Sequence, residues 1–224
     1  ADFPEHTMAA YRGAIEQGAL GFECDIRVTK DEVLILWHDA NMKKEAKSAA
    51  IIANRTYAEI KQIYPAVMTL NELLDLAIEN KKSLALETKH PVPTGNRVEE
   101  LVVAELRKRK DAIKKSGIDV AIMSFSWFAI EKIKKMDPTI KTVMLLGDIT
   151  NKITRRFTSA QVIGPSVEMI RKSPELISEI KNSGKELYVW TVDSTEDLQY
   201  CASVGVDIVM TNRPAHARSV LGYS

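Results

Sequence analysis

The chain has 224 residues, with 31 Lys and Arg against 30 Asp and Glu, so its formal net charge is +1. This balance provides no overall field for nucleic acid or for an acidic membrane surface, and any anion site must therefore be local. The two cysteines belong to no C-x-x-C pair, which argues against a disulfide scaffold, structural zinc and dithiol redox chemistry.

Short β-branched apolar runs alternate with longer amphipathic segments along the chain. This alternation is typical of βα units around a mainly parallel sheet, and the length suits one domain. We therefore predict an α/β fold, a distorted TIM-like (β/α) barrel that forms a single domain over residues 1–224. The predicted strands are residues 21–28, 33–38, 83–89, 120–125, 141–146, 160–163, 186–192 and 207–211.

Two segments interrupt the regular alternation. Residues 29–32 are too few for a crossover helix, so the strands on either side should form a hairpin and distort the barrel. Residues 40 to 53 are polar and rich in Ala and Lys, and they follow the strand that ends at His38. We expect this segment to be a small insertion beside the mouth of the barrel.

Capping residues predict three helix starts. Residues 69–72, Thr-Leu-Asn-Glu, match a capping box, and residues 173–175, Ser-Pro-Glu, combine a cap with a proline suited to the first helical position. Ser194 precedes Leu198 and Cys201 at helical spacing. The first of these helices should pack on the barrel through Leu70, Leu73, Leu74, Ala77 and Ile78.

Two carboxylates lie on one face of the first predicted strand. Side chains alternate along a strand, so Glu23 and Asp25 should point to the same side while Cys24 points to the other. Two buried carboxylates side by side repel each other, and each is costly to desolvate without a partner. A divalent cation would remove both costs, so this pattern favours a metal site.

The strand at residues 83–89 ends in a similar polar pair, Glu87 and Lys89. Both side chains should share one face, where they suit a third oxygen ligand and a phosphate-binding cation. Barrel enzymes build their sites at the carboxyl ends of the strands, where we expect all three acids. Oxygen ligands favour Mg²⁺ or Ca²⁺ over zinc.

His38 ends another apolar strand and is the candidate general acid or base, because an imidazole titrates near neutrality. Each of these features alone is more often a solvated strand face or a structural ion pair. Their joint occurrence in chain order favours a site. His6 should lie near the mouth, where contact with substrate is the alternative, but we expect His6, His90 and His216 to be solvent-exposed loop residues. No nucleophile elbow, phosphate loop or dinucleotide turn is present.

A set of motifs spans almost the whole chain: PEHT at residues 4–7, GFECDIRVTKD at 21–31, HD at 38–39, LETK at 86–89, MSF at 123–125, VWTV at 189–192 and GVDIVMTNRP at 205–214. The set resembles the signature of the glycerophosphodiester phosphodiesterase family, which reads PENT, G-x-E-x-D-V-x-x-T-K-D-G, HD, E-x-K, SF, WTV and GVDGIITDRP.

The resemblance implies roles for seven residues. Glu23, Asp25 and Glu87 would bind one divalent cation, Mg²⁺ or Ca²⁺, and His38 would be one of two catalytic histidines. Lys89 would contact phosphate, Trp190 would line the glycerol or leaving-group side, and Glu5 would belong to the substrate-binding residues.

The resemblance also implies an activity, the hydrolysis of glycerophosphodiesters to glycerol phosphate and an alcohol such as choline or ethanolamine, within lipid and glycerol metabolism. The substrate's own glycerol hydroxyl would attack and form a cyclic phosphate. A lipid-acting phosphodiesterase resembling sphingomyelinase D or lysophospholipase D is one alternative, which an exposed apolar patch beside the mouth would favour. A barrel that binds phosphodiesters without turnover is another.

The sequence departs from the family pattern in five places. The family's His-Arg-Gly motif would lie before Ala1, so we expect the first strand, with a second catalytic histidine and a phosphate-binding arginine, to be missing from these residues. His6 replaces Asn, Glu32 replaces the turn Gly, and Asn212 replaces Asp. The segment after His38 lacks the family's arginine-threonine run.

Partners and compartment follow from the same observations. We expect a small-molecule glycerophosphodiester substrate, no nucleic acid and no stable membrane insertion, because no apolar run approaches the roughly 20 residues that span a bilayer. A homo-oligomer is compatible with the sequence. We expect a cytoplasmic protein, although the chain begins with Ala1 rather than Met and a removed secretion signal would also fit.

Overall fold

The computed structural model describes residues 3–147 and 152–223. Within these residues, eight strands form one sheet in the order β2-β1-β3-β4-β5-β6-β7-β8. Only the β1–β2 pair is antiparallel, and the other neighbours are parallel. The strands are β1 (Gly21–Val28), β2 (Leu34–Leu36), β3 (Ser83–Thr88), β4 (Val120–Ser124), β5 (Lys141–Leu145), β6 (Val162–Gly164), β7 (Glu186–Val189) and β8 (Ile208–Val209).

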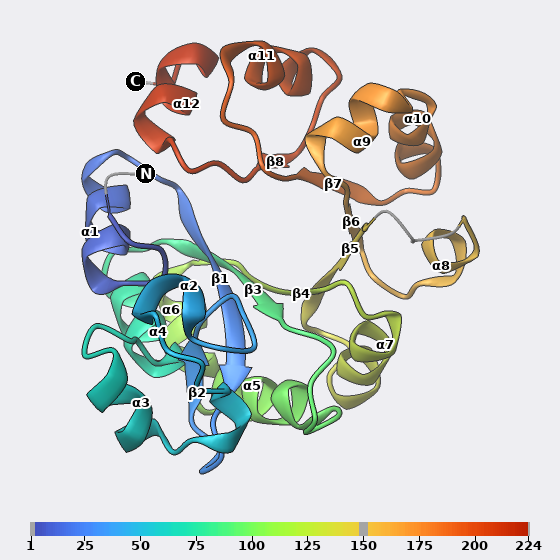
Figure 1. Cartoon of the computed structure of the whole chain (residues 1–224). Coiled ribbons are helices and arrows are strands. Elements are labelled where there is room, and N and C mark those ends of the chain that lie inside the picture. Colours follow the sequence, from blue (N-terminus) through green and yellow to red (C-terminus); the bar gives the residue numbers. More distant parts are fainter. Residues whose placement is uncertain (1–2, 148–151, 224) are drawn as a thin grey trace.

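The sheet is strongly curled, and Figure 1 shows its strands along an arc from β1 to β8. Within the described residues β8 pairs with β7 alone, and β1 pairs with β3 and β2. The arc therefore forms a half-barrel whose open side lies between β8 and β1. This architecture confirms the predicted distorted TIM-like barrel, and each predicted strand is present, although several are shorter than predicted.

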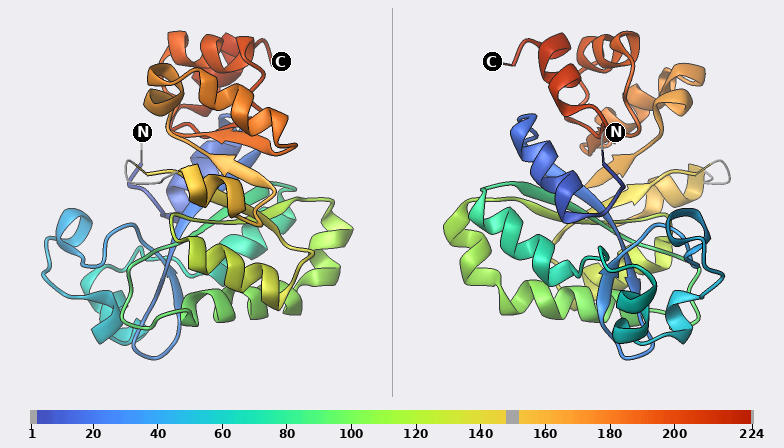
Figure 2. Two further views of the ribbon diagram at one scale, coloured as in Figure 1. Left: turned by 90° about the vertical axis from the view of Figure 1, so that its right-hand side faces the viewer. Right: turned by 60° about the vertical axis from the view of Figure 1, so that its left-hand side comes forward.

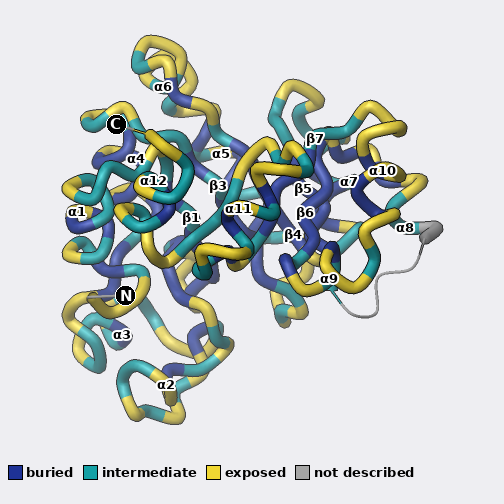
Figure 3. The backbone as a smooth tube through the Cα atoms, turned by 90° about the horizontal axis from the view of Figure 1, so that it is seen from above, coloured by how far each residue is buried: buried dark blue, intermediate teal, exposed yellow. Residues whose placement is uncertain are grey.

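Helices connect the strands and cover the outer side of the curved sheet (Figure 2). Exposed residues are frequent on outer segments such as α2 and α6, whereas the residues of the strands from β4 to β7 are mostly buried (Figure 3). The helical elements are α1 (Met8–Glu16), α2 (Lys43–Ala46), the 3₁₀ helix η1 (Ile52–Asn54), α3 (Tyr57–Ile63), α4 (Leu70–Glu79), α5 (Arg97–Lys108), α6 (Lys110–Ser116), α7 (Trp127–Met136), α8 (Lys152–Phe157), α9 (Val167–Lys172), α10 (Glu175–Asn182), α11 (Thr195–Ser203) and α12 (Pro214–Leu221).

Two of the three predicted helix caps are confirmed. Thr69 and Glu72 form the reciprocal capping box of α4, and Ser194 accepts a hydrogen bond from the backbone of Asp197 at the start of α11. The prediction for α10 is wrong in its cap, because Pro174 occupies the N-cap position without a side-chain bond. Ser173 instead ends the preceding helix, α9.

The predicted hairpin at residues 29–32 is confirmed by the antiparallel β1–β2 pair. Glu32 adopts a left-handed backbone conformation with φ of 61°, at the position where the family signature has Gly. Its carboxylate accepts two hydrogen bonds of 2.7 Å from Arg97 on α5. The turn is therefore tied to α5 by a side chain that glycine would lack.

The insertion at residues 40–53 contains α2 and leads into η1. A single β-bridge between Asn41 and Ile51 closes it at its base. Beneath it, Trp37, Met42 and Ile52 belong to a separate apolar cluster. The insertion is thus a small unit added to the end of β2, as predicted.

Alternation along the strands separates two environments. Cys24, Ile26 and Leu86 are fully buried in the core between the sheet and its helices, whereas Met123 and Leu145 belong to a smaller cluster and line the cavity enclosed by the sheet. Both cysteines are buried and free. Among the described residues, no helix has the length and apolar character required to cross a bilayer.

Candidate functional site

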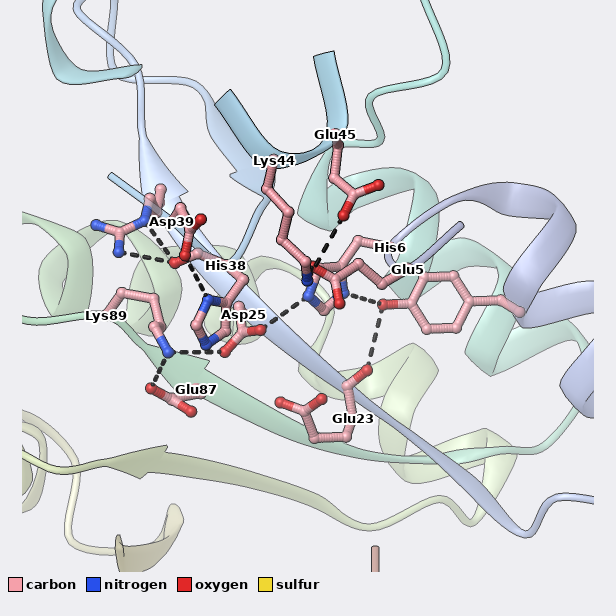
Figure 4. A network of polar contacts seen from close by, with 12 residues as sticks. Glu5, His6, Glu23, Asp25, His38, Asp39, Lys44, Glu45, Glu87 and Lys89 are labelled. Carbon is pink, nitrogen blue, oxygen red and sulfur yellow. Dashed lines mark hydrogen bonds and ion pairs between the residues drawn. The ribbon is translucent and has the colours of Figure 1, made fainter. Parts of the chain in front are cut away.

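Three carboxylates converge on the concave side of the sheet, as Figure 4 shows. Asp25 on β1 is the register partner of Glu87 on β3, and Glu23 lies at the level of Ala85. One oxygen from each carboxylate lies within 4.8 Å of the other two. The three acids come together as predicted. Glu23, however, lies near the start of β1, deeper in the half-barrel, and not near the carboxyl end of the strand as we expected.

The carboxylates strongly perturb one another. Burial and the charges of Asp25 and Glu87 hold the pKa of Glu23 well above its ordinary value. Burial and the charge of Asp25 raise the pKa of Glu87 to about 7. Burial raises the pKa of Asp25 too, but the hydrogen bond from His6 and the charge of Lys89 outweigh burial, so this pKa lies well below its ordinary value.

Lys89 is the cationic partner of the cluster. Its Nζ lies 2.8 Å from Glu87 Oε1 and 3.2 Å from Asp25 Oδ1. Burial lowers the pKa of Lys89, but the two carboxylates outweigh burial and leave this pKa above its ordinary value. One ammonium cannot balance three ionised carboxylates, and the oxygen-only donor set fits a hard divalent cation.

His38 lies directly after β2 and lines the same cavity as the carboxylates. Its Nδ1 is 2.8 Å from Asp39 Oδ1, and its side chain is 52% exposed. Arg27 donates two hydrogen bonds to the backbone carbonyl of His38, at 3.0 Å and 2.7 Å. Asp39 thus holds the ring, and Arg27 holds the backbone that carries it. Nε2 is the ring nitrogen that Asp39 does not contact.

His6 does not occupy the predicted exposed loop position. Its side chain is only 9% exposed, and Nε2 lies 2.8 Å from Asp25 Oδ2. The prediction is also wrong for His90, whose side chain is largely buried and pairs with Glu99 at 2.8 Å. His216 lies in α12 rather than in a loop, and contacts Thr195.

The remaining predicted site residues line the same cavity, which has a volume of about 990 Å³. Trp190 follows β7, donates from Nε1 to the carbonyl of Gly164, and stacks edge-on against Phe125 with ring centroids 5.5 Å apart. Glu5 is exposed, and its carboxylate pairs with Lys44 of the insertion at 2.9 Å. The structure therefore places Glu5 and Trp190 on the cavity wall, outside the carboxylate cluster.

Sequence reasoning missed three residues that support the site: Arg27, Asp39 and Tyr11. Arg27 follows Asp25 by two positions and so shares its face of β1, which was the available signal. Asp39 belongs to the HD motif and was assigned no role. Tyr11 on α1 donates to the backbone carbonyl of Glu23 at 3.2 Å and contacts His6 at 3.1 Å, and the sequence carries no pattern for it.

The open side of the half-barrel borders this cavity. Leu20 before β1 and Ile208 on β8 both line the cavity and are 70% and 44% exposed. Residues 21–25 of β1 pair only with β3 among the described strands, and β8 has one strand neighbour. Two strand edges therefore face each other across an apolar opening. Ala1, where the predicted upstream strand would join, lies outside the described residues.

A parallel, curled sheet with an acid cluster, a lysine and a histidine in its central cavity is the arrangement of a barrel enzyme. A model of the glycerophosphoryl diester phosphodiesterase family matches residues 1–216. The chain belongs to this family and with it to the phosphoric diester hydrolases. The family resemblance and the enzyme class predicted from the motifs are thus confirmed.

Individual relatives agree with this assignment. A Mycobacterium tuberculosis protein named probable glycerophosphodiester phosphodiesterase 1 is 31% identical over 97% of this chain and 88% of its own length. The glycerophosphodiester phosphodiesterase of Bacillus subtilis is 30% identical over 94% of this chain and 80% of its own length.

Solved structures share the fold. An Oleispira antarctica phosphodiesterase in complex with the product sn-glycerol-3-phosphate superposes with a TM-score of 0.82 at 20% identity, covering 98% of this chain and 92% of that one. The glycerophosphodiester phosphodiesterase of Thermotoga maritima gives a TM-score of 0.81 at 20% identity, with 97% and 92% covered.

The raised pKa of Glu87 predicts how stability depends on pH in protein treated with a chelator. Between about pH 4.5 and about pH 7 the folded protein keeps a proton on Glu87 that the unfolded chain has released. The free energy of unfolding should therefore fall as the pH rises through this window, by at most about 1.4 kcal/mol per pH unit from this group. Urea titrations at several pH values should give a flatter curve for Glu87→Gln. Equal slopes in both proteins would contradict the electrostatic description of the cluster.

Proposed function

We propose that this protein hydrolyses glycerophosphodiesters to glycerol phosphate and an alcohol with one divalent cation, Mg²⁺ or Ca²⁺. The observation that carries the proposal is the convergence of Glu23, Asp25 and Glu87 beside Lys89, in a cavity that also contains His38. Membership of the family supplies the reaction class.

The three carboxylates would hold the cation. When bound there, a divalent cation supplies a positive charge that polarises a phosphoryl oxygen and stabilises the charge that develops on it. Lys89 adds a second positive charge, and its Nζ can donate to a phosphoryl oxygen by exchanging one of its carboxylate contacts. Both charges favour a phosphodiester anion within an otherwise neutral protein.

His38 would move the proton between the reacting oxygens. Asp39 accepts from Nδ1 and so favours the tautomer in which Nε2 is free to take a proton. Arg27 fixes the backbone of His38, which limits the movement of the ring relative to β1. These contacts suit general acid and base catalysis, because the group that transfers the proton must lie within hydrogen-bond distance of the reacting oxygen.

Trp190, Phe125 and Glu5 would contact the rest of the substrate. Trp190 and Phe125 both line the cavity and pack edge to face against each other, and Glu5 on the same wall pairs with Lys44 of the insertion. The Oleispira antarctica relative was solved with sn-glycerol-3-phosphate as its product, which supports a glycerol phosphate product for this chain as well. The identity of the alcohol is set by contacts on this outer wall.

A second histidine would come from a further strand between β8 and β1. The unpaired edges on the open side and the exposed Leu20 and Ile208 favour such a strand, because open edges of this kind promote aggregation. A strand in this position would place its inward side chains in the cavity beside Glu23. Activity is therefore best measured on the complete gene product.

Removal of a carboxylate tests the cation site. Glu23→Ala and Glu87→Ala should lower cation-stimulated release of glycerol phosphate from glycerophosphocholine by at least 1,000-fold, on the order of the loss expected when the stabilising charge is removed. Glu79→Ala, at an exposed position at the end of α4, is the control and should retain activity. Circular dichroism checks the fold. Full activity in either site variant refutes the assignment, and a wild type that binds but never cleaves diesters restores the non-catalytic alternative.

Replacement of the histidine separates proton transfer from cation binding. His38→Ala should lower kcat by about 100-fold to 10,000-fold, the usual contribution of a general acid or base, while the affinity for Ca²⁺ changes little. Steady-state kinetics and calorimetric titration measure the two effects, with His216→Ala as the control. A collapse of cation affinity with normal turnover per bound cation would show that His38 has a different role.

A lipid substrate is the second candidate, and it is favoured by exposed aromatic residues at the cavity-lining Phe125 and three positions after it in the chain. Phe128 at the start of α7 is 73% exposed and packs edge-on against Trp127, and Phe125 on the cavity wall is 39% exposed. If these rings bind an acyl chain, Phe128→Ser should lower kcat/KM for lysophosphatidylcholine at least tenfold and leave that for glycerophosphocholine unchanged. Equal effects on both substrates, or a wild type inactive on the lysophospholipid, would exclude this candidate.

A further inference from the structure

His6 connects the N-terminal segment to the carboxylate cluster (Figure 4). Its Nε2 lies 2.8 Å from Asp25 Oδ2, and its Nδ1 lies 3.1 Å from the hydroxyl of Tyr11. Tyr11 in turn donates to the backbone carbonyl of Glu23. A continuous polar chain therefore runs from the backbone of β1 through two side chains and returns to the carboxylate of Asp25 on the same strand.

The two oxygens of Asp25 have different partners. Oδ2 faces His6, whereas Oδ1 faces Lys89 at 3.2 Å. A carboxylate oxygen accepts hydrogen bonds, so Nε2 of His6 is the donor to Oδ2. The contact from His6 thus fixes the rotation of the carboxylate plane.

His6 is held in place by its own segment. Its backbone is left-handed, with φ of 57°, a conformation that non-glycine residues adopt rarely and histidine more often than most. The next residue, Thr7, donates to the carbonyl of Pro4 at 2.8 Å and caps α1 by accepting from the backbone of Ala10. The turn therefore aims the imidazole at Asp25 through fixed backbone geometry.

We propose that His6 is a positioning residue for the cation site, acting through Asp25. His6 is not itself in the group of ligand atoms that lie within 4.8 Å of one another, which consists of Glu23, Asp25 and Glu87. Its contribution is to hold Oδ2, which fixes the orientation in which the Asp25 carboxylate joins the cluster with Oδ1 beside Lys89. Groups that donate a hydrogen bond to a ligating carboxylate commonly change metal affinity by 10-fold to 100-fold. This inference rests on the proposed function.

Calorimetric titration of chelator-treated, full-length protein with Ca²⁺ tests the inference directly. His6→Ala should weaken the affinity at least tenfold. His6→Gln should remain within about threefold of wild type, because the glutamine amide nitrogen is as many bonds from Cα as Nε2 of histidine and can donate to the same oxygen. At saturating Ca²⁺, His6→Ala should recover most of the wild-type kcat, since His6 does not touch the reacting atoms.

His90→Ala is a matched control for the loss of a buried histidine. His90 also contacts a carboxylate at 2.8 Å, but its partner Glu99 lies on α5 outside the cluster. This variant should lower the melting temperature and leave Ca²⁺ affinity within about twofold of wild type. An equal loss of affinity in both alanine variants, or none in His6→Ala, overturns the inference alone. A wild type that binds no divalent cation overturns the proposed cation site as well.

Discussion

The mutual repulsion of three carboxylates in a confined space is the constraint on which this site depends. Glu23, Asp25 and Glu87 are brought within contact distance by strand register, and their surroundings raise the pKa of two of them. Such an arrangement weakens the folded state unless positive charge is present. Lys89 supplies one positive charge and His6 donates a hydrogen bond to Asp25. The negative charge that remains is the physical basis for binding a cation that can also act on a phosphate.

The charged side chains of the site come from a few adjacent elements of the fold. β1 carries two carboxylates on its inner face, and the same strand places Arg27 against the backbone of His38. β3 adds Glu87 and Lys89 from the neighbouring position. The acid/base candidate follows β2 and is bonded through Arg27 to the strand that carries two of the carboxylates, so few elements separate it from the cation site.

Much of this arrangement could be predicted from sequence because it follows from strand periodicity. Glu23 and Asp25 share a face since side chains alternate, and the apolar runs located the eight strands. Several predicted strands are longer than those observed. The strand predicted to run to His38 ends at Leu36, and the backbone amide of Trp37 then bonds the backbone carbonyl of Asp25 as the chain leaves β2. His6 could not be predicted, because its direction depends on a left-handed turn and a helix cap that no period describes. Arg27 was missed because it bonds a backbone carbonyl. Ser173 was misassigned because the last turn of α9 ends there.

The insertion after β2 has an evolutionary consequence. The Asn41–Ile51 bridge closes it at its base, and it packs on its own apolar cluster. It is therefore a separate unit joined to the sheet at one place. Its contact with the substrate wall is the peripheral pair between Lys44 and Glu5. Natural selection can replace or lengthen such a unit, and thereby change which alcohols fit, without disturbing the strands that carry the carboxylate cluster.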